Sequence, residues 1–141
     1  LIQPEIKTHY NAMGQAIAHC DANGNWTNKD YTIRGQVCRI QYPDGSSEQK
    51  EYSLDGLVVK ETAGNGLVTH YTHDAFGRVI RTQRYSPEGQ LLSCLAAAFN
   101  TFHLLSEIDE AGLVTTYHYD GAGRRISAIK GDQITTYAYD T

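Results

Sequence analysis

The sequence lacks the features that mark membrane-spanning and nucleic-acid-binding chains. No apolar run reaches 18 residues, the length at which a stretch becomes a candidate transmembrane helix. The 12 basic residues are scattered among 16 acidic ones and leave a net charge of −4, whereas binding to nucleic acid needs clustered positive charge. With 141 residues, 40% of them hydrophobic, the chain is expected to fold as one domain with a continuous core or sheet.

Cysteine is also scarce. Cys20, Cys38 and Cys94 cannot all pair within one chain, and no two of them have the spacing of a zinc or redox site. We therefore expect free thiols and synthesis in a reducing compartment. A strand over 25–31 would separate Cys20 from Cys38 by about 9.6 Å, which exceeds the roughly 7 Å Cα limit for a disulfide.

The ends of the chain carry no targeting segment. It begins at Leu1 without a basic stretch followed by an apolar one, and it ends inside a motif at Tyr139-Asp140-Thr141. We expect no signal peptide in this segment and interpret the chain as a piece of a longer protein.

Residue patterns for catalysis or metal binding are missing as well. His70 and His73 have a spacing familiar from helices, but on a strand residues three apart point to opposite faces. Cys94 and the serines lack a Gly-x-Ser-x-Gly elbow, and no pair of carboxylates is placed for acid/base work. We predict a chain that is not an enzyme and that has no metal site and no cofactor.

Glycine, in contrast, recurs with a fixed period. Two interleaved series run through the first half of the chain at intervals of 21 residues: Gly14, Gly35, Gly56 and Gly77, and Gly24, Gly45 and Gly66. Acidic, amide or hydroxyl residues precede these glycines, as in Asp21-Ala22-Asn23-Gly24, and such sequences form tight turns. About seven residues separate consecutive turns, enough for one strand.

The best-preserved repeats show the alternation of a β-strand. Leu67, Thr69, Tyr71 and His73 share one face, and residues 66–81 match 112–127 at nine of sixteen positions. Residues 134–140 repeat 114–120 once more. We predict an all-β chain of about ten to twelve short antiparallel strands, built as hairpin repeats in a strip of sheet.

One region, about 90–106, breaks the rhythm. Leu91, Leu95, Ala98, Phe102 and Leu105 are spaced like the apolar stripe of a helix. The alternative is a degenerate repeat in which Phe102 matches Phe76 and His103 stands where Gly77 does. We favour the degenerate repeat, with a short helix or bulged loop over 92–98 left open.

Two strings carry the most specific motif. They are Tyr71-Thr72-His73-Asp74-Ala75-Phe76-Gly77-Arg78 and Tyr117-His118-Tyr119-Asp120-Gly121-Ala122-Gly123-Arg124. The aspartates are placed to accept turn amides, the glycines to adopt positive φ, and the arginines to pair with the turn aspartate or cover a tyrosine ring. Tyrosines at one register would stack as a ladder between hairpins.

These strings resemble the tyrosine-aspartate repeat of the RHS, or rearrangement hotspot, family. That family includes polymorphic toxins, insecticidal toxin-complex B and C components, wall-associated proteins and teneurins. The resemblance covers nearly the whole chain, 1–141, as a single repeat segment. Its structural motif residues here are Tyr71, Asp74, Gly77, Arg78, Tyr117, Tyr119, Asp120, Gly123, Arg124, Tyr137, Tyr139 and Asp140.

The resemblance implies a strip of sheet that coils into a hollow shell around a C-terminal toxin or effector domain. The prolines follow Gln3, Tyr42 and Ser86, so the Asp-Pro motifs of the family's self-cleaving element are not present. Implied partners are the remainder of the shell, its payload and, through unpaired sheet edges, further copies of the chain. The implied location is outside a bacterial cell or on its surface. An alternative function is a module that binds carbohydrate or a cell surface.

Overall fold

The computed structural model describes residues 5–140 and divides into two compact units, Leu1–Val68 and Thr69–Thr141. Thirteen strands and no helix occur in the described part of the chain. The predicted all-β fold of antiparallel hairpins is confirmed, with one strand more than the upper expectation. The single repeat segment over 1–141 stays a prediction.

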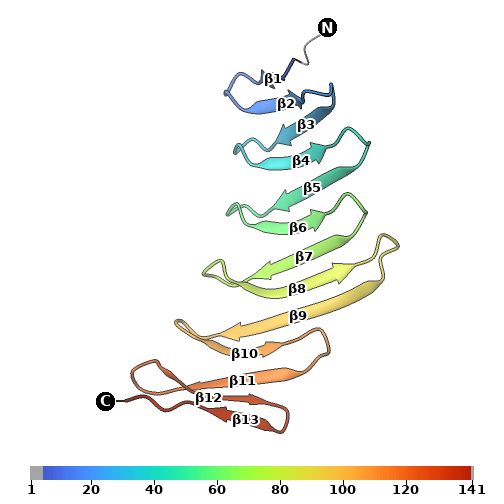
Figure 1. The fold of residues 1–141 in the computed structure, drawn as a ribbon. Helices are drawn as coiled ribbons and strands as arrows, with labels where there is room; N and C mark the ends of the chain where they lie inside the picture. Colours follow the sequence, from blue (N-terminus) through green and yellow to red (C-terminus); the bar gives the residue numbers. More distant parts are fainter. Residues whose placement is uncertain (1–4, 141) are drawn as a thin grey trace. The chain divides into compact units, whose positions relative to one another are not determined.

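Unit Leu1–Val68 is a meander in which strands adjacent in the chain are adjacent in the sheet (Figure 1). Each pairing is antiparallel, as short hairpin connections require. Its strands are β1 (Lys7–Tyr10), β2 (Ala16–Cys20), β3 (Trp26–Tyr31), β4 (Val37–Gln41), β5 (Ser47–Tyr52) and β6 (Val58–Thr62).

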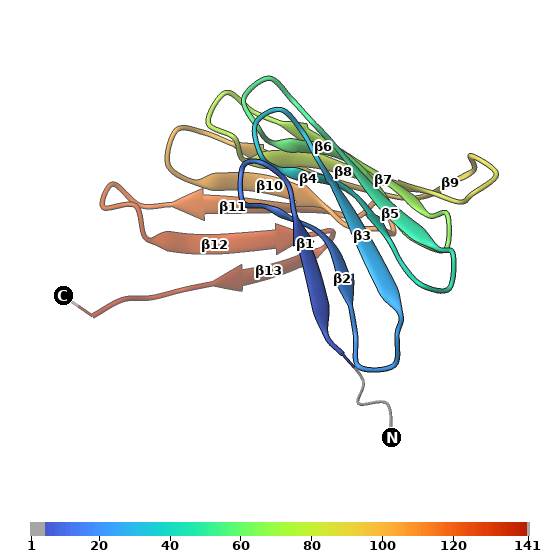
Figure 2. The same ribbon diagram turned by 90° about the horizontal axis from the view of Figure 1, so that it is seen from above.

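Unit Thr69–Thr141 repeats the meander. Its pairings are again antiparallel between consecutive strands. From above, the strand directions rotate within each unit, which is the normal twist of a β-sheet (Figure 2). The strands are β7 (Val68–His73), β8 (Val79–Tyr85), β9 (Leu91–Phe99), β10 (Leu104–Ile108), β11 (Val114–Tyr119), β12 (Arg125–Lys130) and β13 (Gln133–Thr136).

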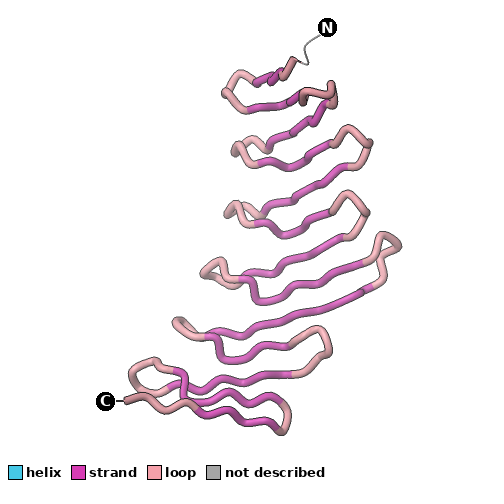
Figure 3. The backbone as a smooth tube through the Cα atoms, viewed as in Figure 1, coloured by secondary structure: helices cyan, strands magenta, loops and turns pink. Residues whose placement is uncertain are grey.

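The hairpin turns lie alternately at the two ends of the strands in each unit and so form two rows (Figure 3). We call one row of turns the motif edge. It holds turns 11–14, 32–35 and 53–56 in the first unit and 74–77, 100–103 and 120–123 in the second. The other is the opposite edge, which includes 21–24, 42–45 and 63–66. The turn 74–77 is typical. The amide of its last residue, Gly77, donates to the carbonyl of its first residue, Asp74, at 3.0 Å, and the Asp74 amide donates to the carbonyl of Arg78 at 2.9 Å. Gly77 has φ of 79°, so this is the three-residue hairpin loop that ends in a left-handed glycine.

Neither unit encloses the continuous hydrophobic core that the composition allowed. Among the described residues only Cys20 and Thr69 are buried, and large side chains such as Ile134 stay 67% exposed. The units are single layers of sheet, and nothing within either unit covers their faces. Cys20 lies on β2 and Cys38 on β4, with β3 between them, as the strand order predicted.

The irregular region is a strand, and the helix or bulged loop over 92–98 is wrong. Leu91 pairs with Tyr85 and Leu95 with Thr82. Tyr85 and Thr82 are three residues apart on β8, so the two leucines point to opposite faces and form no stripe. A bulge that inserts Leu92 shifts the alternation of side chains along this strand.

Candidate functional site

The turn at Asp74 shows how the motif residues act. The Asp74 carboxylate accepts the backbone amides of Phe76 at 2.9 Å and Arg78 at 3.0 Å through Oδ1, and the Arg78 Nε at 2.7 Å through Oδ2. Burial of the carboxyl raises its pKa, but the bonds from Arg78 and Phe76 outweigh burial and hold the pKa below its usual range. The motif aspartate therefore fixes both the turn and the arginine that follows it.

Asp120, in the turn between β11 and β12, repeats this arrangement. It accepts the amides of Ala122 and Arg124, both at 2.9 Å, and the Arg124 Nε at 2.8 Å. These bonds, led by the Arg124 amide, lower the pKa of Asp120. The Arg124 guanidinium lies 5.0 Å from the ring centre of Tyr139, so it makes both of the contacts expected of a motif arginine.

Arg78 also reaches the next turn of the motif edge. Its Nη1 donates to the carbonyl of Asn100 at 2.9 Å, and its guanidinium lies 4.4 Å from the ring centre of Phe99. Gln15 and Gln36, which follow the turn glycine as Arg78 does, donate to the carbonyls of Gly35 at 3.2 Å and Gly56 at 2.8 Å. We call this contact, from the residue after one turn to the backbone of the next, the turn clasp.

Two predicted motif tyrosines, Tyr119 and Tyr139, and two tyrosines that precede earlier motif-edge turns, Tyr31 and Tyr52, connect hairpins by hydrogen bonds rather than by the ring stacking that we expected. We call these four the motif tyrosines. Each hydroxyl donates at 2.7 or 2.8 Å to a backbone carbonyl that lies 14 or 15 residues earlier in the chain. The four pairs are Tyr31 to Ala16, Tyr52 to Val37, Tyr119 to Leu104 and Tyr139 to Arg125. The ladder is therefore one of hydroxyls and carbonyls.

The accepting carbonyls belong to residues that stand beside β-bulges. Ala16 pairs with Tyr10, and Val37 with Tyr31, at the point where the register shifts. The extra residue of the bulge is apolar in each case, Ile17 in β2 and Cys38 in β4. A tyrosine from one repeat thus holds the irregular backbone of the repeat before it.

The remaining predicted motif residues play separate parts. Tyr117 donates a hydrogen bond to Glu107, which raises the pKa of the Tyr117 phenol, and its ring centre lies 4.1 Å from the Arg125 guanidinium. Tyr137 donates its backbone amide to Ile126. Tyr71 is half-buried on β7, and Asp140 is exposed after the last strand. The structure brings Asp, Gly and Arg of each motif together, whereas Tyr71, Tyr117 and Tyr137 lie outside the turns.

His103 corrects our alignment of the irregular repeat. It stands in the place of Arg78 rather than Gly77, because the turn is one residue shorter: Asn100 N bonds to His103 O, where Asp74 N bonds to Arg78 O. Asn100 Oδ1 accepts the amides of Phe102 and His103, and the His103 ring lies 4.4 Å from that of Tyr119. Phe102 matches Phe76 as expected.

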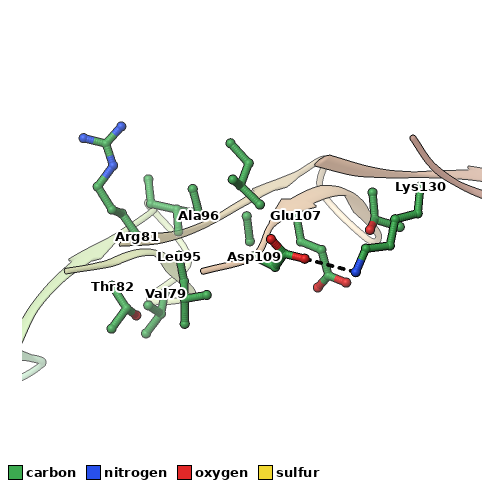
Figure 4. A pocket seen from close by; sticks show the side chains of 12 residues that line it. Val79, Arg81, Thr82, Leu95, Ala96, Glu107, Asp109 and Lys130 are labelled. Carbon is green, nitrogen blue, oxygen red and sulfur yellow. Dashed lines mark ion pairs between the residues drawn. The ribbon is translucent and has the colours of Figure 1, made fainter. Parts of the chain in front are cut away.

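A groove of about 340 Å³ crosses unit Thr69–Thr141 (Figure 4). Val79 and Leu95 form part of its apolar side, while Arg81, Glu107, Asp109 and Lys130 supply its charges. Lys130 Nζ lies 3.0 Å from Asp109 Oδ2, and the Leu113 amide followed by Lys130 lowers the pKa of Asp109. This groove could not be predicted from the sequence, because its residues come from β8 to β12 and share no motif.

Three of the charged side chains that line the groove have partners in the same unit. Asp109 holds Lys130 and two turn amides, and Glu107 accepts the Tyr117 hydroxyl. No group of three or more metal-binding side chains occurs among residues 5–140. No described helix is long and apolar enough to cross a membrane. The arrangement accounts for structural roles of the motif residues.

Comparison with known proteins agrees with the repeat motif. The model of a family described as RHS repeat matches residues 52–92 and 99–133. "Double-stranded DNA deaminase toxin A" of Burkholderia cenocepacia (strain H111) is 23% identical over 146 residues, which cover 89% of this chain and 10% of that protein.

Solved structures show the same fold. A Tc holotoxin pore of Photorhabdus luminescens superposes with a TM-score of 0.67 at 21% identity, over 87% of this chain and 7% of that one. The TcdB2-TccC3 complex without its hypervariable C-terminal region gives 0.68 at 22% identity, with the same coverage. The chain therefore spans a tenth or less of the length of these proteins.

Proposed function

Because the chain belongs to the RHS repeat family, we propose that it is a non-catalytic wall segment of a β-shell that encloses or presents a C-terminal toxin or effector domain. The observation that carries this proposal is the single-layer sheet, whose hairpins are joined by tyrosine hydroxyls and turn clasps. A sheet with neither face covered is suited to be a wall. The toxins named among its relatives support a toxin-related setting.

Several parts of this proposal concern the longer protein. Its partners are the remaining repeats and the enclosed domain, and its location is outside the bacterial cell or on the cell surface. The absence of catalysis is inferred from the use of Asp74, Asp109 and Asp120 as turn acceptors. Recognition of carbohydrate gains no support from the four motif tyrosines whose hydroxyls bind backbone carbonyls, and a glycan array decides that alternative.

Limited proteolysis of the full-length gene product tests enclosure. We expect the C-terminal domain of that product to resist protease until the shell is opened by denaturant, and Tyr52→Phe together with Arg78→Ala to lower the denaturant concentration required. Cleavage of that region at the same rate in native and opened protein would contradict enclosure. The exposed variant Ala22→Ser is the matched control.

A further inference from the structure

Two Asn-Gly pairs stand in hairpin turns of the opposite edge of unit Leu1–Val68. They are Asn23-Gly24 in turn 21–24 and Asn65-Gly66 in turn 63–66, at the third and fourth places of each turn. An asparagine before glycine is chemically labile, because glycine has no side chain to shield its amide nitrogen from the neighbouring side-chain carbonyl. Both reacting groups belong to one turn, so the reaction requires water but no open surface.

The two turns differ in the residue at their first place. In the first turn the Asp21 carboxylate accepts the amides of Asn23 at 2.8 Å and Asn25 at 2.9 Å, and the Asn25 side-chain amide at 3.0 Å. Ala63 stands at the same place of the second turn and has no side-chain acceptor. One turn is therefore fixed by three side-chain hydrogen bonds that the other cannot form.

In the second turn the side chain of Asn65 binds the amide that a first-place acceptor would otherwise take. Asn65 Oδ1 accepts the Leu67 amide at 3.1 Å, which holds the side-chain amide of Asn65 beside its peptide bond to Gly66. The same donor stabilises the negative charge that develops on Oδ1 when the carbonyl carbon is attacked. The Asn23 side chain makes no hydrogen bond within the described residues.

We propose that Asn65 is a site of spontaneous deamidation through a cyclic imide formed with Gly66. The Gly66 amide, which donates to the Ala63 carbonyl at 2.8 Å, is freed when the turn opens and gives its proton to hydroxide. Its nitrogen bonds to Cγ of Asn65, the Cγ–Nδ2 bond breaks, and the departing nitrogen takes a proton from water and leaves as ammonia. Water then hydrolyses the imide at one of its two carbonyls, which gives aspartate or isoaspartate.

An aspartate in the equivalent place shows which product the turn can hold. Asp44 also precedes a turn glycine, and its Oδ1 accepts the Ser46 amide at 2.9 Å. The aspartate product at residue 65 can therefore keep its turn. In isoaspartate the main chain gains one carbon, which disrupts the 2.9 Å bond from the Ala63 amide to the Leu67 carbonyl. This modification does not depend on the wall function proposed above.

Peptide mapping of the chain after incubation in mildly alkaline buffer tests the proposal. Modified peptides are identified by the mass gained when an amide becomes an acid, and isoaspartate by methyl transfer with an isoaspartyl methyltransferase. We expect Asn65 to react at least about fivefold faster than Asn23, the factor that one hydrogen bond contributes to the equilibrium for opening a turn. In urea the two rates should be similar, because both asparagines precede glycine.

Two reciprocal substitutions test the cause of this difference. Asp21→Ala removes the carboxylate and should raise the rate at Asn23 by a similar factor. Ala63→Thr supplies the hydroxyl acceptor that Thr32 provides in its own turn, and it should lower the rate at Asn65. Asn65→Gln should abolish the fast reaction of that peptide, because glutamine would have to close a larger ring.

Several results would overturn the proposal. They are absence of modification at Asn65, a rate at Asn65 no faster than that at Asn23 in the folded chain, or a difference of the same size in urea. An unchanged rate at Asn65 in Ala63→Thr, or at Asn23 in Asp21→Ala, would also overturn it. Circular dichroism of each variant shows that the rates are those of folded protein.

Discussion

The hydroxyl of Tyr52 donates a 2.7 Å hydrogen bond to the carbonyl of Val37, the residue paired with Tyr31 beside the preceding bulge. One motif tyrosine therefore secures the irregular backbone next to another. An ordinary strand ladder does not supply this link, because the bulge interrupts the ladder at that point. The repeated tyrosine in this way links neighbouring hairpins by a hydrogen bond.

Replacing Tyr52 with phenylalanine tests this role. The variant keeps the ring and removes the hydroxyl, leaving the half-buried Val37 carbonyl without that donor. We expect a loss of about 1 kcal/mol in the free energy of unfolding, measured with urea. Tyr10→Phe is the control, because Tyr10 is 62% exposed and its hydroxyl has no hydrogen bond within the described residues. Equal losses in the two variants would show that the Tyr52 hydroxyl does not stabilise the contact between hairpins.

The sequence predicts the turns and strands because their signals are local. Gly77 follows Asp74 at the spacing that a hairpin loop requires, and alternation marks the strands between loops. The bulges are different: nothing adjacent to Cys38 announces an extra residue, and the carbonyl that Tyr52 binds lies 15 residues away. Contacts between repeats, such as Arg78 with Asn100, depend on the register of neighbouring strands and could not be predicted from one sequence.

His103 shows why the irregular repeat was harder to interpret. Its turn lacks a left-handed glycine and is one residue shorter, so alignment by residue type placed it at Gly77. Leu91 and Leu95 are four residues apart but lie on opposite faces of β9, because Leu92 is inserted between them at a bulge. In both cases a one-residue change in length shifted the pattern, while the sheet kept its order by pairing each strand with its neighbours.

Gly123→Ala is expected to destabilise the protein more than Gly14→Ala. Both glycines have positive φ, 79° and 76°, so each alanine bears the strain of the left-handed region, roughly 1–2 kcal/mol. A Cβ at Gly123 would also lie 2.9 Å from His103 Nε2, whereas one at Gly14 meets nothing within 4 Å. Thermal unfolding of purified variants measures the difference.

A double-mutant cycle separates strain from crowding at Gly123. In a His103→Ala background the loss from Gly123→Ala should fall toward that of Gly14→Ala, since the crowding atom is gone. Gly123→Val should exceed every substitution of a histidine by alanine, because a β-branched residue is disfavoured at positive φ. Losses from Gly123→Val no larger than those from the histidines would mean that the turn tolerates other conformations.

Acid should weaken the motif turns through Asp120. Its pKa in the folded protein lies below the ordinary 3.8, chiefly because of the Arg124 amide and then the Arg124 side chain. The carboxylate therefore contributes stability above the unfolded-state pKa, and this contribution is lost as the pH falls from about 5 through the folded-state pKa. Asp120→Asn keeps an acceptor for the turn amides and does not titrate.

Melting temperatures between about pH 7 and pH 2.5 measure this effect. The unmodified chain should be the more stable at neutral pH, and the gap to Asp120→Asn should narrow as the pH falls from about 5 and close only below the folded-state pKa. Asp132→Asn, an exposed turn carboxylate of the same unit, controls for the change in net charge. A gap that stays constant across this range would show that the charge of Asp120 is not what stabilises the turn.

Arg78→Lys and Arg124→Lys should differ in their effect on stability. Arg78 uses Nε for its own turn and Nη1 for the Asn100 carbonyl, so a lysine cannot make both bonds. Arg124 is 50% exposed, and its Nε pairs with Asp120 inside one turn. We expect roughly 1 kcal/mol of extra loss for Arg78→Lys in urea unfolding. Equal losses would show that the clasp to the Asn100 turn contributes nothing.

The free side of β13 leads to a prediction about association. β13 pairs with β12, and no second partner strand is found for it in the described part of unit Thr69–Thr141. Its sequence, Gln133-Ile134-Thr135-Thr136, carries no charge or proline, the devices that keep edge strands from pairing. We expect the chain to associate edge to edge as its concentration rises, and Thr135→Lys to shift it toward monomer.

Ala111→Lys is the control for this prediction. It adds the same charge at an exposed turn and should leave the association unchanged, because that turn offers no strand to pair with. Sedimentation velocity over a concentration range, with hydrogen exchange at 133–136, measures both effects. A monomer at every concentration with slow exchange over 133–136 would mean that another part of the chain already covers the edge.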